Sequence, residues 1–135
     1  MKLDKDTILL IDDDQLSNAL NEHLVASTKI FKNIIVKNGP VDAFRHIVNK
    51  VLTDKIIPGY IIIDIDMPDI DGFEFIDLLA ELFEENNINF TPIYIILSSS
   101  NYIRDFELAE KTPSIKKMIS KPLNSEKLIS LFNEI

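Results

Sequence analysis

Acidic residues and one lysine follow apolar runs that have the character of buried strands. In chain order they are Asp12, Asp13 and Asp14, then Asp64 and Asp66, and finally Lys121, with Ser98 ending another such run. The carboxyl ends of neighbouring parallel strands meet at one edge of an open sheet, so we expect these side chains to converge on a single crevice. The pattern predicts a Mg²⁺ site beside a nucleophilic aspartate.

A single aspartate at a strand-to-helix junction often has a purely structural role as a helix N-cap, and we expect this role for Asp14. A cap does not account for Asp12 and Asp13 beside it, nor for Asp64 at the end of a second strand. Two carboxylates about 4 Å apart repel by about 4 kcal/mol at an effective dielectric of 20. We therefore expect a cation between them.

The ligand types indicate which cation. Carboxylates, a backbone carbonyl and water suit Mg²⁺, whereas zinc favours histidine or cysteine. The chain has no cysteine, and His23 and His46 lie in predicted helices away from the strand ends, so we assign them no chemistry.

Lys121 balances the predicted site. Three ionised aspartates, Mg²⁺ and the Lys121 ammonium give a formal charge of zero, so the pocket can accept an added phosphoryl dianion. Ser98 could donate a hydrogen bond to a phosphoryl oxygen, although serines in loops often serve only as turn residues.

Five apolar runs alternate with helix-period stretches, which is typical of an α/β protein with a parallel sheet. The runs are almost continuous in Ile, Leu and Val, as in strands covered on both faces. The predicted strands are residues 7–11, 33–37, 60–64, 93–98 and 115–119.

Helices are predicted from apolar residues at helical spacing. The stripes expected to face the core are Leu16, Ala19, Leu20 and Leu24; Phe44, Ile47, Val48 and Val51; Phe75, Leu78, Leu79, Leu82 and Phe83; Ile103, Phe106 and Ala109; and Leu128, Leu131, Phe132 and Ile135. Asp71 with Glu74 predicts a capping box, and Asn124 a cap for the last helix. Residues 56–59 and 111–114 are predicted turns, and residues 84–87 a mobile loop.

Length and composition exclude several classes of protein. A chain of 135 residues with 46% hydrophobic residues fits one domain. The net charge of −8 argues against binding to nucleic acid. The charged N-terminus is unlike a secretion signal, and the apolar runs are too short to span a bilayer. We expect a soluble cytoplasmic protein with no membrane association.

The chain resembles the receiver domain of two-component response regulators over essentially its whole length, residues 1–135. The motifs that carry the resemblance are Asp12-Asp13, Asp64 with Met67-Pro68 and Asp71-Gly72, Ser98, and Lys121-Pro122. The resemblance implies a flavodoxin-like, doubly wound sheet in the order 2-1-3-4-5, with helices on both faces. It also implies a stand-alone domain with no output domain, which catalyses only its own phosphorylation and dephosphorylation.

The same resemblance implies roles for the site residues. Asp64 would accept a phosphoryl group from a sensor histidine kinase or a histidine phosphotransfer protein. Asp13, Asp64 and the Asp66 main-chain carbonyl would ligate Mg²⁺ directly, and Asp12 would act mainly through water. Phosphorylation would shift the surface around the fourth helix for protein–protein output or phosphorelay. The Lys121–Pro122 bond is expected to be cis.

Two residues depart from the family pattern. Met118 occupies a position, three before Lys121, that is usually aromatic and reports activation through its rotamer. A flexible thioether has no such defined pair of rotamers, so we expect readout to depend more on backbone movement of residues 98–102. Asp66, two residues beyond the predicted phosphoacceptor, could orient a hydrolytic water or simply face solvent.

Two alternatives stay open. Asp64 and Asp66 also match the opening motif of haloacid-dehalogenase-like phosphatases, although in that family the further acidic pair follows the lysine, whereas Asp12-Asp13 lies upstream. The other alternative is a receiver that is never phosphorylated and serves only as a docking module.

Overall fold

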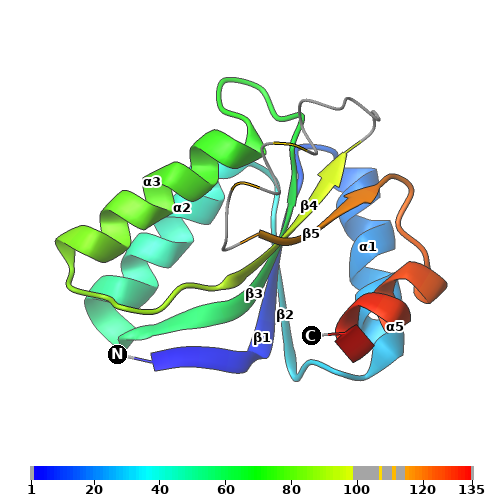
Figure 1. The fold of residues 1–135 in the computed structure, drawn as a ribbon, viewed down its shortest axis with the longest axis horizontal. Helices are drawn as coiled ribbons and strands as arrows, with labels where there is room; N and C mark the ends of the chain where they lie inside the picture. Colours follow the sequence, from blue (N-terminus) through cyan, green and yellow to red (C-terminus); the bar gives the residue numbers. More distant parts are fainter. Residues whose placement is uncertain (1, 99–106, 108–110, 112–114, 135) are drawn as a thin grey trace.

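A single parallel sheet organises the molecule. The computed structural model describes residues 2–98, 107, 111 and 115–134. The strands are β1 (Lys2–Ile11), β2 (Asn33–Lys37), β3 (Ile56–Asp64), β4 (Ile93–Ser98) and β5 (Ile115–Ser120). They are arranged in the order β2-β1-β3-β4-β5, and every neighbouring pair is parallel (Figure 1). This order confirms the predicted flavodoxin-like α/β class.

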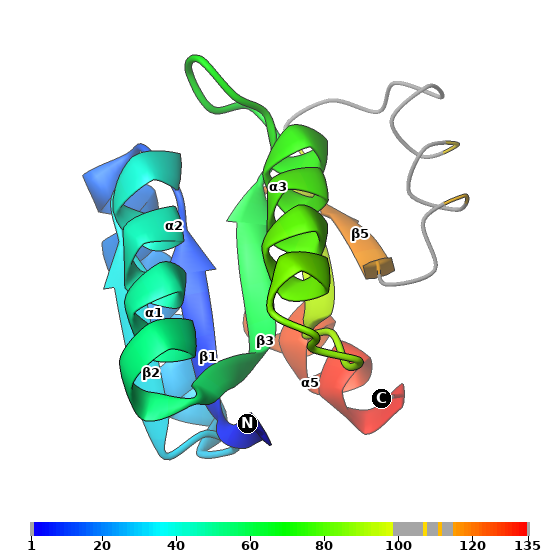
Figure 2. The same ribbon diagram turned by 90° about the vertical axis from the view of Figure 1, so that its left-hand side faces the viewer.

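Helices cover both faces of the sheet (Figure 2). They are α1 (Gln15–Thr28), α2 (Pro40–Asn49), the short π-helical segment η1 (Lys50–Asp54), α3 (Gly72–Glu85) and α5 (Ser125–Glu134). α2 and α3 lie on one face, while α1 and α5 lie together on the other. No helix of the described residues is both apolar enough and long enough to traverse a bilayer. The predicted helix around Ile103, Phe106 and Ala109 falls outside the described residues.

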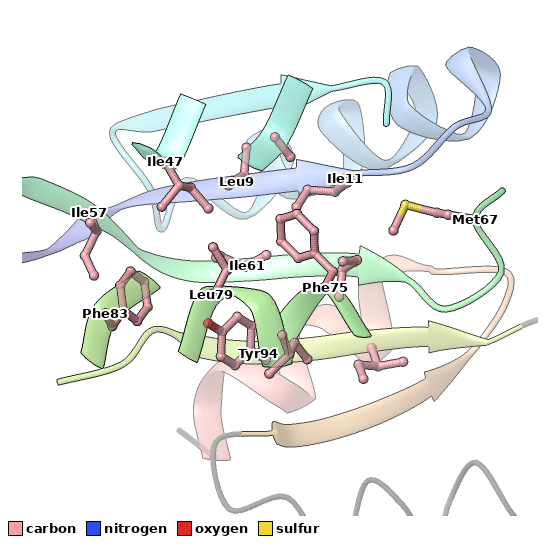
Figure 3. Close-up of a cluster of buried hydrophobic side chains, with 14 of the residues drawn as sticks. Leu9, Ile11, Ile47, Ile57, Ile61, Met67, Phe75, Leu79, Phe83 and Tyr94 are labelled. Atoms are coloured by element: carbon pink, nitrogen blue, oxygen red, sulfur yellow. The ribbon is translucent and has the colours of Figure 1, made fainter. Parts of the chain in front are cut away.

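The strands feed two separate cores, because successive side chains of a strand point to opposite faces. On the α2–α3 side, Leu9 and Ile11 of β1 pack with Ile61 of β3, as Figure 3 shows. On the other side, Ile8 and Leu10 pack toward α1 and α5. Since both faces are covered, the runs are continuous in apolar residues rather than alternating.

Two strands are longer than predicted by several residues, and β5 extends by one residue to Ser120. Residues 56–59 were expected to form a turn, yet they belong to β3, and β1 begins at Lys2 rather than at residue 7. The two strands pair from Lys2↔Ile56 onward, with a register shift between Asp4 and Ile8. Pro58 and Gly59 lie at this irregularity, where a missing N–H or side chain is tolerated. A Cβ on Gly59 would lie 2.7 Å from the Asp4 main-chain oxygen, so the close approach of the strands requires glycine.

The predicted inward stripe of α1 is wrong at Leu16, Ala19 and Leu20, whereas Leu24 packs partly buried against the core on the α1–α5 side. Leu16 and Leu20 are 68% and 57% exposed, and the residues that α1 buries are Asn18, Asn21 and Val25. In this rotation of the helix, the Asn18 side chain donates to backbone carbonyls at the ends of β1 and β2. These polar contacts, rather than burial of the leucine side chains, determine which face of α1 is turned toward the sheet.

The other helices follow the predicted pattern more closely. Ile47, Phe75, Leu79, Phe83, Leu128 and Leu131 are buried. The capping box of Asp71 and Glu74 is confirmed, and Asn124 Oδ1 accepts from Lys127 N at 2.8 Å. The predicted loop at residues 84–87 is wrong in its first half, because α3 continues through Glu85 and the side chain of Asn86 then donates to the Leu82 carbonyl.

Candidate functional site

The turn after β1 carries the first two predicted acids. Asp12 is buried, and its Oδ1 accepts a hydrogen bond from Asp14 N at 2.9 Å. Asp13 is exposed at the edge of the sheet. Asp14 caps α1 through a 3.0 Å bond from Leu16 N, and this bond holds the pKa of the Asp14 carboxyl below its usual value. The prediction that Asp14 is a helix cap is confirmed.

Asp64 is the last residue of β3 and is almost fully buried. Its Oδ1 accepts a hydrogen bond from Asp66 N at 3.1 Å. The chain beyond it is held in place because Ile65 N donates to Leu97 O and Gly72 N donates to Ile65 O. A Cβ on Gly72 would lie 3.3 Å from the Asp64 main-chain oxygen, so the start of α3 packs directly on this strand end.

Lys121 connects the two buried carboxylates. Its Nζ lies 3.0 Å from Asp64 Oδ2 and 3.3 Å from Asp12 Oδ2. Burial lowers the pKa of the Lys121 ammonium, but its contacts with Asp64 and Asp12 outweigh burial and hold that pKa above the usual value. The Lys121–Pro122 peptide bond is cis, as the resemblance implied. Three residues from three different strand ends therefore meet in one ion-paired group.

The three carboxylates lie close enough together to hold a cation. Oxygen atoms of Asp12, Asp13 and Asp64 all lie within 4.8 Å of one another. Burial raises the pKa of Asp64 to about 6, although Asp66 N–H and Lys121 act in the opposite direction and Asp12 adds to the rise. The Asp64 carboxylate is buried, has a raised pKa and lies beside two other carboxylates. A bound hard cation would therefore stabilise its ionised form. The residues present fit Mg²⁺, whose preferred ligands are oxygens.

Comparison with known proteins identifies the family. The model of the response regulator receiver domain matches residues 8–133. The chain belongs to this family. It is similar over 96% of both chains, at 33% identity and a TM-score of 0.83, to a two-component response regulator from Cytophaga hutchinsonii. A response regulator receiver protein from Dyadobacter fermentans is 25% identical, with 98% and 97% of the two chains covered and a TM-score of 0.77.

A more distant likeness supports the fold alone. The chemotaxis protein CheY4 of Vibrio cholerae is 18% identical, covers 98% of this chain and 99% of its own, and has a TM-score of 0.72. Among curated proteins, none matches the sequence significantly. Receiver domains bind Mg²⁺ at an acidic pocket, and in this chain Asp12, Asp13 and Asp64 form an acidic cluster.

Ser98, Asp66 and Met118 are the remaining predicted residues of the receiver that the structure describes. Ser98 ends β4 and is fully buried, and its main-chain oxygen accepts from Lys121 N at 2.7 Å. Asp66 is exposed, and Met118 is partly buried against the core on the α2–α3 side. Residues 99–102, to which we assigned the readout, lie outside the described residues.

Two supporting residues escaped the sequence analysis. Asn18 Nδ2 donates toward the Asp12 carbonyl at 2.8 Å, and the Lys37 carbonyl and Asn38 Oδ1 lie within 3.3 Å of it. Lys127 Nζ donates to the carbonyls of Ser120 and Pro122, both at 2.9 Å, on either side of Lys121. The one available signal was the spacing of Asn18 and Asn21, two amides on one face of a predicted helix.

Proposed function

We propose that this receiver is a phosphoacceptor in which Asp64 takes a phosphoryl group from a phosphohistidine of a sensor kinase or phosphotransfer protein. The observation that carries the proposal is the Lys121 ammonium lying between Asp12 and Asp64, with Asp13 in the same cluster. The arrangement leaves a carboxylate nucleophile next to a fixed positive charge. It also brings together acids that repel one another unless a cation is bound.

Asp64 needs no general base, because its carboxylate is ionised at neutral pH with a pKa of about 6. Its oxygen forms a bond to phosphorus as the phosphorus–nitrogen bond of the donor histidine breaks. A loose phosphoryl-transfer transition state requires mainly positioning and charge neutralisation. The Asp66 N–H orients the Asp64 carboxylate, and Lys121 is in place to pair with the incoming phosphoryl oxygens.

Asp13 and Asp64 would hold Mg²⁺ directly, together with the main-chain carbonyl of Asp66, and Asp12 would act through water. When bound, the ion supplies positive charge that offsets the phosphoryl oxygens. Ser98 is the residue we assign to a hydrogen bond with the new phosphoryl group. Movement of its loop would then alter the surface for a protein partner.

Intact-mass measurement after incubation with a small phosphodonor tests the proposal. We expect one phosphoryl adduct in the presence of Mg²⁺, and none after EDTA or in Asp64→Asn. An adduct that persists in Asp64→Asn would place the phosphoacceptor elsewhere. Because the chain belongs to the receiver family, an unphosphorylated docking module is the main alternative, and it predicts neither an adduct nor Mg²⁺ binding. Turnover of an aryl phosphate would instead favour the phosphatase reading of Asp64 and Asp66.

A further inference from the structure

An apolar groove lies between α2 and α3, on the face of the sheet opposite α1 and α5. It has a volume of about 410 Å³, and its apolar lining includes Val41, Phe44, Val48, Ile70, Phe75 and Leu78. Val41 is 66% exposed and Leu78 is 40% exposed, so the groove is open to water along its top. Grouped apolar side chains that remain exposed in this way often mark a binding surface.

The sequence of α2 explains why the groove exists. Ala43 and Ile47 face the core, whereas Val41, Phe44 and Val48 recur at helical spacing as a second apolar stripe. The Phe44 ring meets Phe75 of α3 edge-on, with centroids 6.4 Å apart at 84°. Phe75 is itself buried in the core that Figure 3 shows, so the groove has a rigid floor.

The lining indicates the kind of molecule that fits. Small-molecule sites combine apolar walls with several converging polar groups that fix orientation, and here Arg45 is the one charged residue among those lining the groove. An open apolar groove between two neighbouring helices instead suits a third helix, which inserts side chains at i, i+3, i+4 and i+7.

Charge around the groove decides the character of that helix, because two carboxylates of α3 outnumber the Arg45 guanidinium of the lining. Glu74 and Glu81 lie four residues before and three residues after Leu78 on α3, so they share its side of the helix. Both are exposed. A second copy of this chain would bring another acidic rim and a net charge of −8, which opposes self-association.

We propose that the α2–α3 groove binds a basic amphipathic helix of a partner protein. Its apolar stripe contacts Val41, Phe44, Val48 and Leu78, and its lysines or arginines lie beside Glu74 and Glu81. The proposal is independent of the role assigned to Asp64, because it depends only on the groove and its rim.

A pair of synthetic helices tests the proposal by NMR titration of the full chain. The first peptide has leucines at i, i+3, i+4 and i+7 flanked by lysines, and the second has glutamates in place of the lysines. We expect the lysine peptide to give saturable shifts centred on Val41, Phe44, Ile70 and Leu78. Its affinity should fall roughly tenfold at high salt, since exposed charges are screened.

Variants separate the apolar and the charged contributions. Leu78→Ser should weaken binding by roughly tenfold or more, whereas Ile129→Ser, at a 50% exposed position on α5, should not. Glu74→Gln with Glu81→Gln should weaken binding several-fold, whereas Glu22→Gln with Glu126→Gln, on α1 and α5, should have no effect. Each control matches the chemistry of its test on the opposite face of the sheet.

Three results would overturn the proposal. The first is the absence of saturable shifts at the groove, and the second is equal affinity for the glutamate peptide. The third is concentration-dependent dimerisation of the wild-type chain that Leu78→Ser abolishes, because the occupant would then be a second copy.

Discussion

At the scale of single residues, the site depends on the carboxylates of Asp12 and Asp64, whose negative charge is partly neutralised by Lys121. Burial raises the pKa of Asp64 to about 6, so its ionisation falls within an accessible range of pH. The folded, metal-free protein takes up this proton more readily than the unfolded chain does. Stability contributed by protonated Asp64 is therefore present at low pH and lost as pH rises from about 4 to about 6.

This linkage gives a measurable pH dependence. In EDTA, we expect the free energy of unfolding contributed by Asp64 to decrease as pH rises through that range, and we expect Mg²⁺ to restore stability above it. Urea denaturation of wild type and Asp64→Asn measures the effect, because the variant lacks the titrating carboxylate. Identical pH profiles for the two proteins would show that Asp64 does not titrate in this range.

Asn18 is the clearest residue-scale test of how the acidic turn is held. Its amide nitrogen faces three oxygen acceptors, so an isosteric carboxylate in Asn18→Asp would meet repulsion there. We expect a loss of about 3 kcal/mol in stability and roughly tenfold weaker Mg²⁺ binding, measured by urea denaturation and calorimetry.

Asn21→Asp provides the matched control, because Asn21 is buried three residues further along the same helix. A stability loss without a change in Mg²⁺ affinity is expected there. Equal loss of Mg²⁺ affinity in both variants would mean that Asn18 acts only by stabilising α1.

The role of Asp66 is tested through the lifetime of the acyl phosphate. It is exposed, and its main-chain N–H donates a hydrogen bond to Asp64 Oδ1 at 3.1 Å. If the carboxylate orients a hydrolytic water, Asp66→Asn should lengthen the lifetime of the acyl phosphate roughly tenfold or more. An unchanged lifetime in a radiolabel or mass-spectrometric decay measurement would exclude that role.

At the scale of elements, the start of α3 is tightly fitted against β3. Gly72 allows this fit, since a Cβ would lie 3.2 Å from Ile65 Cα. We expect Gly72→Ala to cost about 1–2 kcal/mol and to slow phosphorylation, because the chain after Asp64 must shift. Gly39→Ala, where nothing lies within 4 Å of the added carbon, should be neutral in both measurements.

The orientation of α1 gives a second prediction at this scale. Leu16→Lys and Leu20→Lys should change stability by no more than about 0.5 kcal/mol, because both side chains are exposed. Val25→Ala should cost roughly 2 kcal/mol, since Val25 is fully buried between α1 and the sheet. Urea denaturation measures these changes, and a large loss of stability for either leucine variant would contradict this orientation of α1.

At the scale of the whole molecule, most of the fold was predictable from the sequence. Strands covered on both faces must be continuous in apolar residues, so β2 and β4 were predicted with their observed bounds. Convergence of Asp12, Asp64 and Lys121 followed from the geometry of parallel strand ends. Hydrogen bonds from side chains to backbone atoms could not be predicted, because no pattern of side chains shows that Asn18 or Lys127 donates to a main-chain carbonyl.

Errors arose where local patterns compete with distant partners. Pro58-Gly59 is typical of a turn, and only its pairing with Asp4 across the register shift makes it part of β3. Leucine spacing in α1 predicted the wrong inward face, because hydrogen bonding to strand ends determines which side of the helix is buried. In both cases tertiary contacts override a valid local preference.

The N-terminal part of β1 has a consequence for how the protein behaves in concentrated solution. β2 begins only opposite Thr7, so residues 2–6 extend past it, while Lys2, Leu3 and Asp4 are paired with β3 on their other side. A strand end of this kind is a template on which foreign chains can add and grow into aggregates. Lys2, Asp4, Lys5 and Asp6 place charges of both signs along it, and these charges disfavour the stacking of further strands there.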